Sequence, residues 1–578
     1  MEAWCGFVDR SAVPILLALP VALAALSVSP QQGARLNAAS VQALGAPFIC
    51  HVPQPVACQR PPAGGYVAEP PQLFSRAGRL NVELDYVSSV DSAGRKLFCF
   101  VTPDGLESPT LHVRPGDTLN IHLKNLVAAP SDARGGTMSM AVGAAGRCGA
   151  AAMNASSVNI HFHGTHTSPT CHADDVLHTL VNSGESFDYH VRFPRTQPPG
   201  LYWYHPHVHG QSEPAVKGGA SGAIVVDGLE RLQPIVAGLP ERTLILRDQA
   251  VAGDPPAGGA VPTTDVTLNY APIAYPALTP AKIAIAPGRE EFWRVLNASA
   301  ETVLDLALVY DGVDQPLRVV GLDGVPTGSH DGASPGVVLT MTHILIPAAG
   351  RAEFVIKGPS RQVAQASLVT RAIAMGPDGD NDIARPLARL VAEDAGVAAT
   401  VAAMPKVGAP TPAPRGSSDR LDTAPIAARR KLYFSEVPPD PYDPTSQAKY
   451  FITVEGAPPR IFDPAAPPAI VTTEGAVEDW TIENRSREMH EFHIHQVHFK
   501  LIDRDGQPLP PDQQQYFDTV QVPFWKGSGP YPSITVRIDF SGVAGDLLYH
   551  CHMLDHEDGG MMAVVRVVAR GRGGSGRL

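Results

Sequence analysis

Residues 110–127 read "TLHVRPGDTLNIHLKNLV", two short runs of alternating apolar and polar side chains with Pro-Gly-Asp between them. An alternation with a period of two places every second side chain on the same face of a β-strand. Runs of this kind, separated by turn residues, begin near residue 75 and resume after residue 242 in "RTLILRDQAV". We therefore expect a chain built from short strands and turns.

The composition supports the same interpretation. The 578 residues include 56 prolines and 53 glycines, which favours many turns over long helices. This length is enough for three or four domains of ordinary size. The formal net charge of −12 argues against a nucleic-acid partner, because the chain has no excess of cations to neutralise a phosphate backbone.

Three strand-rich blocks divide the chain, so we expect three all-β domains of sandwich or barrel type. A Pro/Ala/Ser-rich stretch before the third block is typical of a linker. The predicted parts are an N-terminal extension (30–74), a first domain (75–230), a second domain (231–401), a linker (402–430), a third domain (431–568) and a disordered tail (569–578).

The N-terminus carries the apolar stretch "SAVPILLALPVALAALSVSP" at residues 11–30. It is short and interrupted by proline, which suits the apolar core of a signal peptide better than a membrane span. We expect residues 1–29 to be a cleaved signal, with an uncleaved anchor as the alternative. The chain is then exported to the periplasm or secreted, with no stable membrane insertion.

The seven cysteines fall into three groups. Cys5 would leave with the signal, and Cys551 stands alone near the C-terminus. Because the remaining five are an odd number, they can form at most two disulfides and leave one thiol over. Export permits these bonds. The sequence leaves the pairing open among Cys50, Cys58, Cys99, Cys148 and Cys171.

Ten of the 21 histidines occur in four clusters, each of which contains the pattern H-x-H. Residues i and i+2 of a strand point to the same face, so each pattern supplies two neighbouring imidazoles. If the four strands converge, eight imidazoles surround one small space, enough for two or three metal ions. The clusters are "HFHG" (His161, His163), "WYHPHVHG" (His205, His207), "HEFHIH" (His490, His493, His495) and "HCHMLDH" (His550, His552, His556).

A second set of ligands is out of phase with the first. Cys551 lies between two histidines of an H-x-H pair and must point to the opposite face of the strand, and His490 lies three residues before His493. Together with His556 they form a His2Cys set, with Met561 as a weak axial ligand, which is the chemistry of a blue-copper electron-transfer site. A metal there enforces the thiolate form of the cysteine. One residue then joins this copper covalently to the histidines on the other face.

At these residues the sequence resembles the multicopper oxidases, the laccase-like family with three cupredoxin domains, over roughly residues 75–568. All four copper motifs occur in the family's order. The resemblance implies an all-β fold of three consecutive cupredoxin-like Greek-key β-sandwich or barrel domains and four copper ions per chain. It further implies type 1 ligands His490, Cys551 and His556 with Met561 axial, type 2 ligands His161 and His493, and type 3 ligands His163, His205, His207, His495, His550 and His552.

The sequence departs from the family at Glu491, where proline is frequent. This leaves the ligand set intact but changes the shape and charge expected near the type 1 copper. Glu557 occupies a position that resembles the family's acidic proton relay. Asp174 and Asp175 stand where the family also places an acidic residue, and the sequence does not decide between them. His209 extends the second cluster at strand spacing but is expected to be structural.

The resemblance implies an enzyme that takes single electrons from a reducing substrate and reduces O2 to water. Phenols and aromatic amines are the expected reductants. Cu(I) or Fe(II) is the alternative: no methionine-rich segment supports it, but acidic residues near the type 1 histidines could attract cations. A non-catalytic copper-binding relative would be expected to lack ligands, and none is missing here. A lone thiolate among ten histidines does not resemble a zinc site. The acidic residues concerned are Glu488, Glu491, Asp555, Glu557 and Asp558.

Overall fold

The computed structural model describes residues 58–570 except for 130–147, 151, 254–260, 394–419, 441 and 444–445. Strands dominate the described residues and the helices are short, which confirms the expected all-β fold. No helix among them is long and apolar enough to cross a membrane. The predicted signal peptide, residues 30–57 of the predicted extension and residues 571–578 lie outside the described part of the chain.

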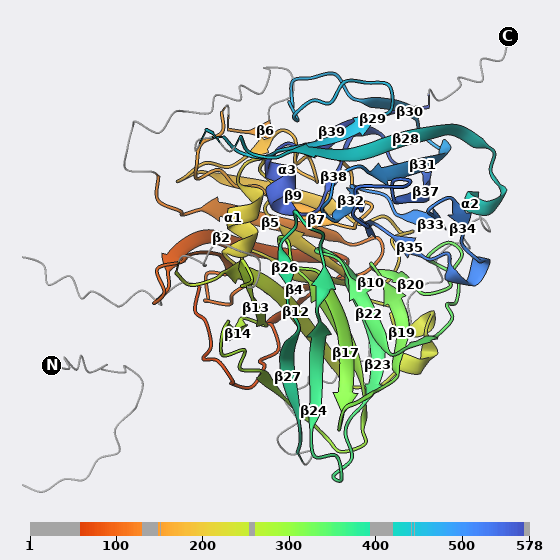
Figure 1. Ribbon diagram of the computed structural model, residues 1–578. Helices are drawn as coiled ribbons and strands as arrows, with labels where there is room; N and C mark the ends of the chain where they lie inside the picture. Colours follow the sequence, from red (N-terminus) through yellow and green to blue (C-terminus); the bar gives the residue numbers. More distant parts are fainter. Residues whose placement is uncertain are drawn as a thin grey trace, which may run out of the picture. The chain divides into compact units, whose positions relative to one another are not determined.

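The sheets come in three pairs that follow one another along the chain (Figure 1). In the first pair, the alternation of residues 110–127 becomes strands β4 and β5, and every second residue of β5 is buried. One sheet has the order β1 (Gln72–Phe74), β4 (Thr110–Val113), β11 (Gly222–Val226), β10 (Gly200–His205), β7 (His161–His163); the other has β3 (Lys96–Val101), β2 (Arg79–Val90), β5 (Thr118–Asn125), β9 (Ser186–Arg192). Three short elements accompany them: β6 (Cys148–Gly149), β8 (Thr179–Leu180) and helix α1 (Ser212–Lys217).

The second pair is the largest, and Figure 1 draws most of it in green. Its first sheet has the order β14 (Ala271–Ile273), β13 (Thr264–Leu268), β12 (Glu241–Ala250), β16 (Glu290–Asn297), β23 (Arg351–Lys357), β19 (Leu317–Leu322), β20 (Val325–Pro326), with β21 (Leu339–Met341) on β19. Its second sheet has β15 (Ala281–Ile285), β27 (Arg385–Ala392), β24 (Ala366–Arg371), β17 (Leu304–Tyr310), β18 (Val313–Asp314), with β22 (His343–Ile346) on β17. Strands β25 (Ile373–Ala374) and β26 (Asn381–Asp382) form a separate ribbon.

The third pair carries the C-terminal histidines. One sheet has the order β29 (Lys449–Val454), β28 (Ile426–Val437), β31 (Val477–Asn484), β37 (Ser533–Asp539), β33 (Phe499–Arg504), β34 (Gln507–Pro508), with β35 (Tyr516–Phe517) on β33. The other has β30 (Ile470–Thr473), β39 (Met562–Val568), β38 (Gly545–Cys551), β32 (His490–Ile494), β36 (Thr519–Val522). Helices α2 (Arg420–Thr423) and α3 (Leu554–Asp558) flank these sheets.

Each pair encloses its own apolar core, to which both of its sheets contribute. In the third core, for example, Trp480 from one sheet packs with Phe492 from the other. A smaller cluster joins the first and second pairs, in which Trp203 and Leu201 lie with Ile245 and Leu296. The pairs are thus β-sandwiches, as the resemblance to cupredoxin domains implied, while the predicted limits of the domains stay predictions.

Two segments differ from their sequence interpretation. The predicted linker 402–430 ends in α2 and in the first residues of β28, which pair in parallel with β31. That part of the strand has Ala and Arg where a strand usually carries larger apolar residues, so its composition resembled a linker. The predicted extension 30–74 contains β1, which pairs with β4 at the edge of a sheet.

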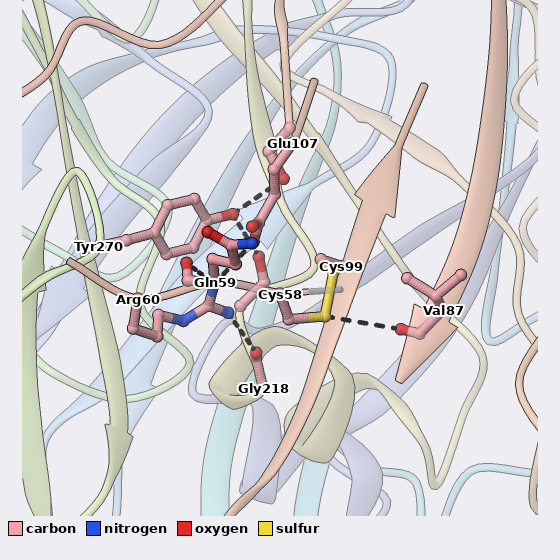
Figure 2. Close-up of a disulfide and its surroundings, with 10 residues drawn as sticks. Cys58, Gln59, Arg60, Val87, Cys99, Glu107, Gly218 and Tyr270 are labelled. Carbon is pink, nitrogen blue, oxygen red and sulfur yellow. Dashed lines mark hydrogen bonds and ion pairs between the residues drawn. A yellow bond between two sulfur atoms is a disulfide. The ribbon is translucent and has the colours of Figure 1, made fainter. Parts of the chain in front are cut away.

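A disulfide and an arginine hold the residues before β1. Cys58 is bonded to Cys99 on β3, and Cys148 to Cys171, which answers the pairing that the sequence left open. Arg60 binds Glu107 at 2.7 Å and the carbonyl oxygen of Gly218 at 3.1 Å. Its guanidinium lies 4.1 Å from the ring centre of Tyr270 in the second sheet pair (Figure 2). This segment therefore connects the first two sandwiches.

The variant Cys58→Ser/Cys99→Ser tests this attachment. The bond closes a loop of 41 residues, so its loss should lower the free energy of unfolding by about 2–5 kcal/mol. Urea denaturation of the metal-free variant and parent would measure the difference. An unchanged midpoint would contradict a structural role for the bond.

Candidate metal centre

Strand register brings the histidine motifs together in two places. In the first sandwich β7 and β10 are antiparallel, with His161 opposite His205. In the third, β32 and β38 are antiparallel, with His493 opposite His550 and Phe492 opposite Cys551. Opposite residues of paired strands point to the same face, so each sandwich presents one face of imidazoles.

The two faces meet. The ring of His161 stacks on that of His495 with 3.9 Å between centroids, and the ring of His163 stacks on that of His493 at 4.0 Å. His207 of the first sandwich lies against His550 of the third, with 3.3 Å between their Nε2 atoms. All eight histidines of the H-x-H pairs are therefore gathered in one buried space between the first and third sandwiches.

The geometry divides this space into groups that could each hold a metal ion. In three sets of three histidines, the ligand atoms all lie within 4.8 Å of one another. His552 adds a further ring, with its centroid 5.0 Å from that of His163. The three sets are His207/His495/His550, His161/His163/His205 and His161/His493/His495.

Many of the ring nitrogens that face this space have no protein hydrogen-bond partner. Buried ring nitrogens without a hydrogen bond include Nε2 of His161, His205 and His493, Nδ1 of His163 and both nitrogens of His552. Unpaired buried polar atoms are costly and rare in native proteins, so a concentration of them needs a ligand to explain it. Burial also lowers the pKa of His493 and His552 well below its ordinary range, and that of His550 to about 3. Neutral imidazoles with free lone pairs suit a metal ion.

A second site lies on the other face of β38. Cys551 Sγ is 3.7 Å from Nδ1 of His490 and 3.7 Å from Nδ1 of His556, and the two nitrogens are 3.0 Å apart. A point equidistant from the three atoms lies about 2 Å from each, the length of a metal–imidazole or metal–thiolate bond. Met561 is buried in the same apolar cluster as Cys551. The alternation of faces expected around Cys551 is thus present, and the donor set fits copper.

Glu491, the departure from the family pattern, directs its side chain away from this site. Its Oε1 accepts a hydrogen bond from the backbone N–H of Ala348 in the second sandwich at 2.9 Å, and the residue is fully buried. Its own backbone N–H, which proline would lack, donates to Cys551 Sγ at 3.4 Å. The residue therefore adds a backbone donor to Cys551 Sγ that proline would lack.

The structure separates the two candidate aspartates. Asp174 is buried; its Oδ1 accepts from Nδ1 of His161 and the backbone N–H of Phe162, both at 3.0 Å, and its Oδ2 accepts from Gln496 at 2.8 Å. Asp175 instead pairs with His178, with 2.8 Å between Oδ1 and Nδ1. Asp174 is the one that touches the histidine cluster.

Glu557 lies in a buried position between the two sites. Neither carboxyl oxygen has a hydrogen-bond partner, and Oε1 is 3.8 Å from Nδ1 of His207 and 4.0 Å from Nδ1 of His209. Burial, with the charge of Asp558 nearby, raises the pKa of Glu557 well above its ordinary value. His209 is partly exposed, and its exclusion from the ligands stays a prediction.

The outer edge of His556 faces acidic and aromatic groups. Its Nε2 lies 3.4 Å from Glu488 and 3.6 Å from Asp555. The half-buried ring of Tyr450 stacks on its imidazole, with 4.2 Å between centroids. His490, by contrast, has its Nε2 occupied by Ser486 Oγ at 2.6 Å.

The sequence did not predict the residues that hydrogen-bond to the ring nitrogens of the cluster histidines. The backbone carbonyl of Asp518 accepts from Nδ1 of His493 at 2.8 Å, and its carboxylate lies 3.1 Å from Nε2 of His163. Arg351, from the second sandwich, pairs with that carboxylate. Neither residue belongs to a histidine motif, and nothing in the local sequence distinguishes them from surface charges.

Comparisons with known proteins agree with this arrangement. Two family models described as "Multicopper oxidase" match residues 152–230 and 433–571, the segments that hold all the candidate ligands. A laccase from Haloferax volcanii is 40% identical over 91 residues, which is 15% of this chain and only 15% of the laccase's own length. A multicopper oxidase McoA variant from Aquifex aeolicus has a TM-score of 0.62 at 17% identity, covering 88% of this chain and 100% of that one. A Campylobacter jejuni multicopper oxidase, described as a metallo-oxidase, has a TM-score of 0.58 at 19% identity, covering 89% and 96%.

A cupredoxin-like β-sandwich fold with a His2Cys site beside a histidine cluster defines a class of copper proteins. The two family models, the laccase and the similar solved structures all support the multicopper oxidase family for this chain. Membership of that family implies copper cofactors.

The two aspartates give a matched pair of variants. Asp174→Ala removes the acceptor of three buried or partly buried donors and should destabilise the metal-free protein by at least about 3 kcal/mol. Asp175→Ala breaks one partly exposed pair and should cost less than about 1 kcal/mol. Chemical denaturation of both variants would measure this, and equal losses would contradict the assignment of Asp174 to the cluster.

Proposed function

We propose that this chain is an oxidase that takes electrons singly from a reducing substrate at one copper and reduces O2 to water at a cluster of three. The observation that carries the proposal is the group of buried histidine nitrogens without partners, one residue away from a His2Cys set of metal-binding size. Four bound copper ions would supply the redox chemistry that no side chain of the chain can perform.

The ligands are proposed as follows. His490, Cys551 and His556 hold the type 1 copper, with Met561 as axial ligand. His161 and His493 hold the type 2 copper. His163, His205 and His552 lie together on one side of the cluster, and His207, His495 and His550 on the other, which suits one type 3 copper each.

Cys551 connects the two sites through the shortest possible stretch of chain. His550 and His552 are its neighbours in sequence and face the cluster, while its sulfur faces His490 and His556. The backbone N–H of His552 also donates to the carbonyl oxygen of Glu491 at 3.0 Å, which ties β38 to β32 beside the thiolate. Electrons therefore have both a covalent path and a hydrogen-bonded path between the sites.

Two carboxyl groups are placed to handle the protons that O2 reduction consumes. Glu557 is buried beside His207, and burial raises its pKa well above the ordinary value, which favours the protonated form that a proton donor needs. Asp174 accepts hydrogen bonds from Nδ1 of His161 and from the side chain of Gln496. We assign Glu557 as a proton donor and Asp174 as the acid that orients His161.

Electrons are proposed to reach the type 1 site through His556, because its outer nitrogen is directed at Glu488 and its ring is covered by half-buried Tyr450. Phenols and aromatic amines, which can stack on an aromatic ring and hydrogen-bond to a carboxylate, are the proposed reductants. The laccase similarity supports this class.

A second candidate is the oxidation of Cu(I) or Fe(II). The carboxylates of Glu488 and Asp555 at His556 would attract a cation, and burial with the charge of Glu488 raises the pKa of nearby Glu436 to about 7. The similarity in fold to a protein described as a metallo-oxidase is compatible with it. A non-catalytic copper-binding role is the remote alternative.

We also propose that the protein works outside the cytoplasm, in the periplasm or secreted. The two disulfides support an oxidising compartment.

Oxygen uptake by the copper-loaded protein tests the function. A phenol, an aromatic amine, Fe(II) and Cu(I) would be offered in turn, with peroxide assayed alongside and Cys551→Ser as the control. Uptake without peroxide that is lost in Cys551→Ser is expected. Uptake with metal ions alone, reduced in Glu488→Gln, would select the metallo-oxidase alternative. No uptake with any donor at full copper occupancy would contradict an oxidase.

Glu557→Gln tests the proton donor. Turnover with the preferred reductant should fall by at least about tenfold, since positioned proton transfer contributes about 10²–10⁴-fold. Anaerobic reduction of the type 1 copper should keep its rate, because that step needs no proton from Glu557. Stopped-flow absorbance would follow both steps, and an equal loss in each would contradict the role.

A further inference from the structure

Arg351 of the second sandwich reaches the histidine cluster although its sandwich contributes none of the proposed ligands. The side chain begins on β23 and is fully buried. Its Nη1 donates to Asp518 Oδ1 at 2.8 Å and its Nη2 donates to Asp518 Oδ2, which is a bidentate pair with the third sandwich. Its Nε donates to the carbonyl oxygen of Leu201 on β10 at 3.2 Å. One guanidinium therefore contacts all three sandwiches.

Asp518, which Arg351 holds in place, contacts the imidazoles of His163 and His493. Its Oδ1 lies 3.1 Å from Nε2 of His163, and its backbone carbonyl accepts from Nδ1 of His493 at 2.8 Å. The neighbouring Thr519 Oγ1 is 3.1 Å from the same Nδ1. The nitrogens left without partners, Nδ1 of His163 and Nε2 of His493, are the opposite ones in each ring. The contacts with residues 518–519 thus determine which nitrogen of each ring is free for a metal.

Asp323, also from the second sandwich, fixes the backbone of the same segment. Its Oδ2 accepts from the backbone N–H groups of Asp518 at 3.2 Å and Thr519 at 3.4 Å, and its Oδ1 accepts from the N–H of Arg351 at 2.8 Å. The space around the ion pair is full: a Cβ on Gly164 would lie 2.5 Å from both Arg351 Nη2 and Asp518 Oδ2. A side chain at position 164 would therefore displace the pair.

The chemistry of metal sites predicts that the contacts of Asp518 with the two histidines affect metal binding. A ligand histidine is oriented by the partner of its other ring nitrogen, and loss of that partner typically weakens metal binding about 10–100-fold. A buried carboxylate keeps its place only while its charge is compensated. Arginine compensates the carboxylate charge through two parallel hydrogen bonds from its planar guanidinium, a geometry that a lysine ammonium cannot reproduce.

We propose that Arg351 is a positioning residue for the three-copper cluster, acting through Asp518 on His163 and His493. The inference rests on the proposed function, because it assumes that these histidines bind copper. The second sandwich, which provides no ligand, then has a defined part in copper binding.

The test compares the two copper sites within one molecule. Arg351→Met and Arg351→Lys would be loaded with copper, and the copper content, the type 1 thiolate absorption and the type 2 electron paramagnetic resonance signal recorded. We expect Arg351→Met to bind cluster copper about 10–100-fold more weakly, with the type 1 signature unchanged, and Arg351→Lys to fall between it and the parent. The type 1 site is an internal control because Arg351 makes no hydrogen bond to its described ligands.

Arg294→Met is the matched control. Arg294 is buried on the adjacent strand β16 and pairs with Glu241 and Glu353 instead of Asp518. The Arg294→Met substitution should lower the melting temperature of the metal-free protein but leave the ratio of type 1 to cluster copper unchanged. If Arg351→Met does not fold, Asp518→Asn, which keeps the shape and removes the charge, takes its place in the comparison.

Two outcomes would overturn the inference: cluster copper retained at parental affinity in Arg351→Met, or type 1 and cluster copper lost in parallel. A parent protein that binds type 1 copper but no cluster copper would instead refute the proposed function, and the inference with it. The parent measurement therefore separates the two failures.

Discussion

The register between β32 and β38 is the constraint on which both candidate metal sites depend. With His493 opposite His550, the histidines of these strands share one face, and Cys551 and His490 are left for the other. Because side chains alternate across a strand, a shift by one residue would exchange the two faces. The cysteine would then point into the histidine cluster, and both donor sets would be lost together. The apolar packing of Phe492, Trp480 and Tyr549 behind the strands holds this register.

The two candidate metal sites differ in how they are built. The His2Cys site belongs to the third sandwich alone, and its three donors come from β32, β38 and α3. The histidine cluster exists only where the first and third sandwiches meet, so it depends on interfaces as well as on folding. The second sandwich takes part in those interfaces through the cluster of Trp203 with Ile245 and through the buried pair of Arg351 and Asp518. Burying such a pair is costly unless its polar groups are hydrogen-bonded, and here every guanidinium nitrogen of Arg351 donates and both carboxylate oxygens of Asp518 accept.

The sequence indicated which histidines gather and where the cysteine points, because that information is local. The pattern H-x-H on a strand fixes which side chains share a face, and the insertion of Cys551 within one pattern separates two sites without knowledge of the fold. Prediction from the sequence failed for elements that depend on contacts with distant parts of the chain. The strand β28 begins with small and charged residues that resembled a linker, and β1 is held by pairing with β4 rather than by its own composition. Asp174 and Asp175 are chemically identical neighbours, and only the position of His161 distinguishes them.

The sequence by itself determined the all-β class, which side chains enter each of the two clusters, and the alternation that keeps the clusters apart, because each follows from the period of a strand. Only the tertiary structure decided how the eight histidines meet, which cysteines pair, that Glu491 turns its carboxyl to Ala348, and that Arg351 and Asp518 support the cluster. These contacts join residues far apart in the chain. Their partners are chosen by the packing of whole sandwiches, which no short stretch of sequence encodes.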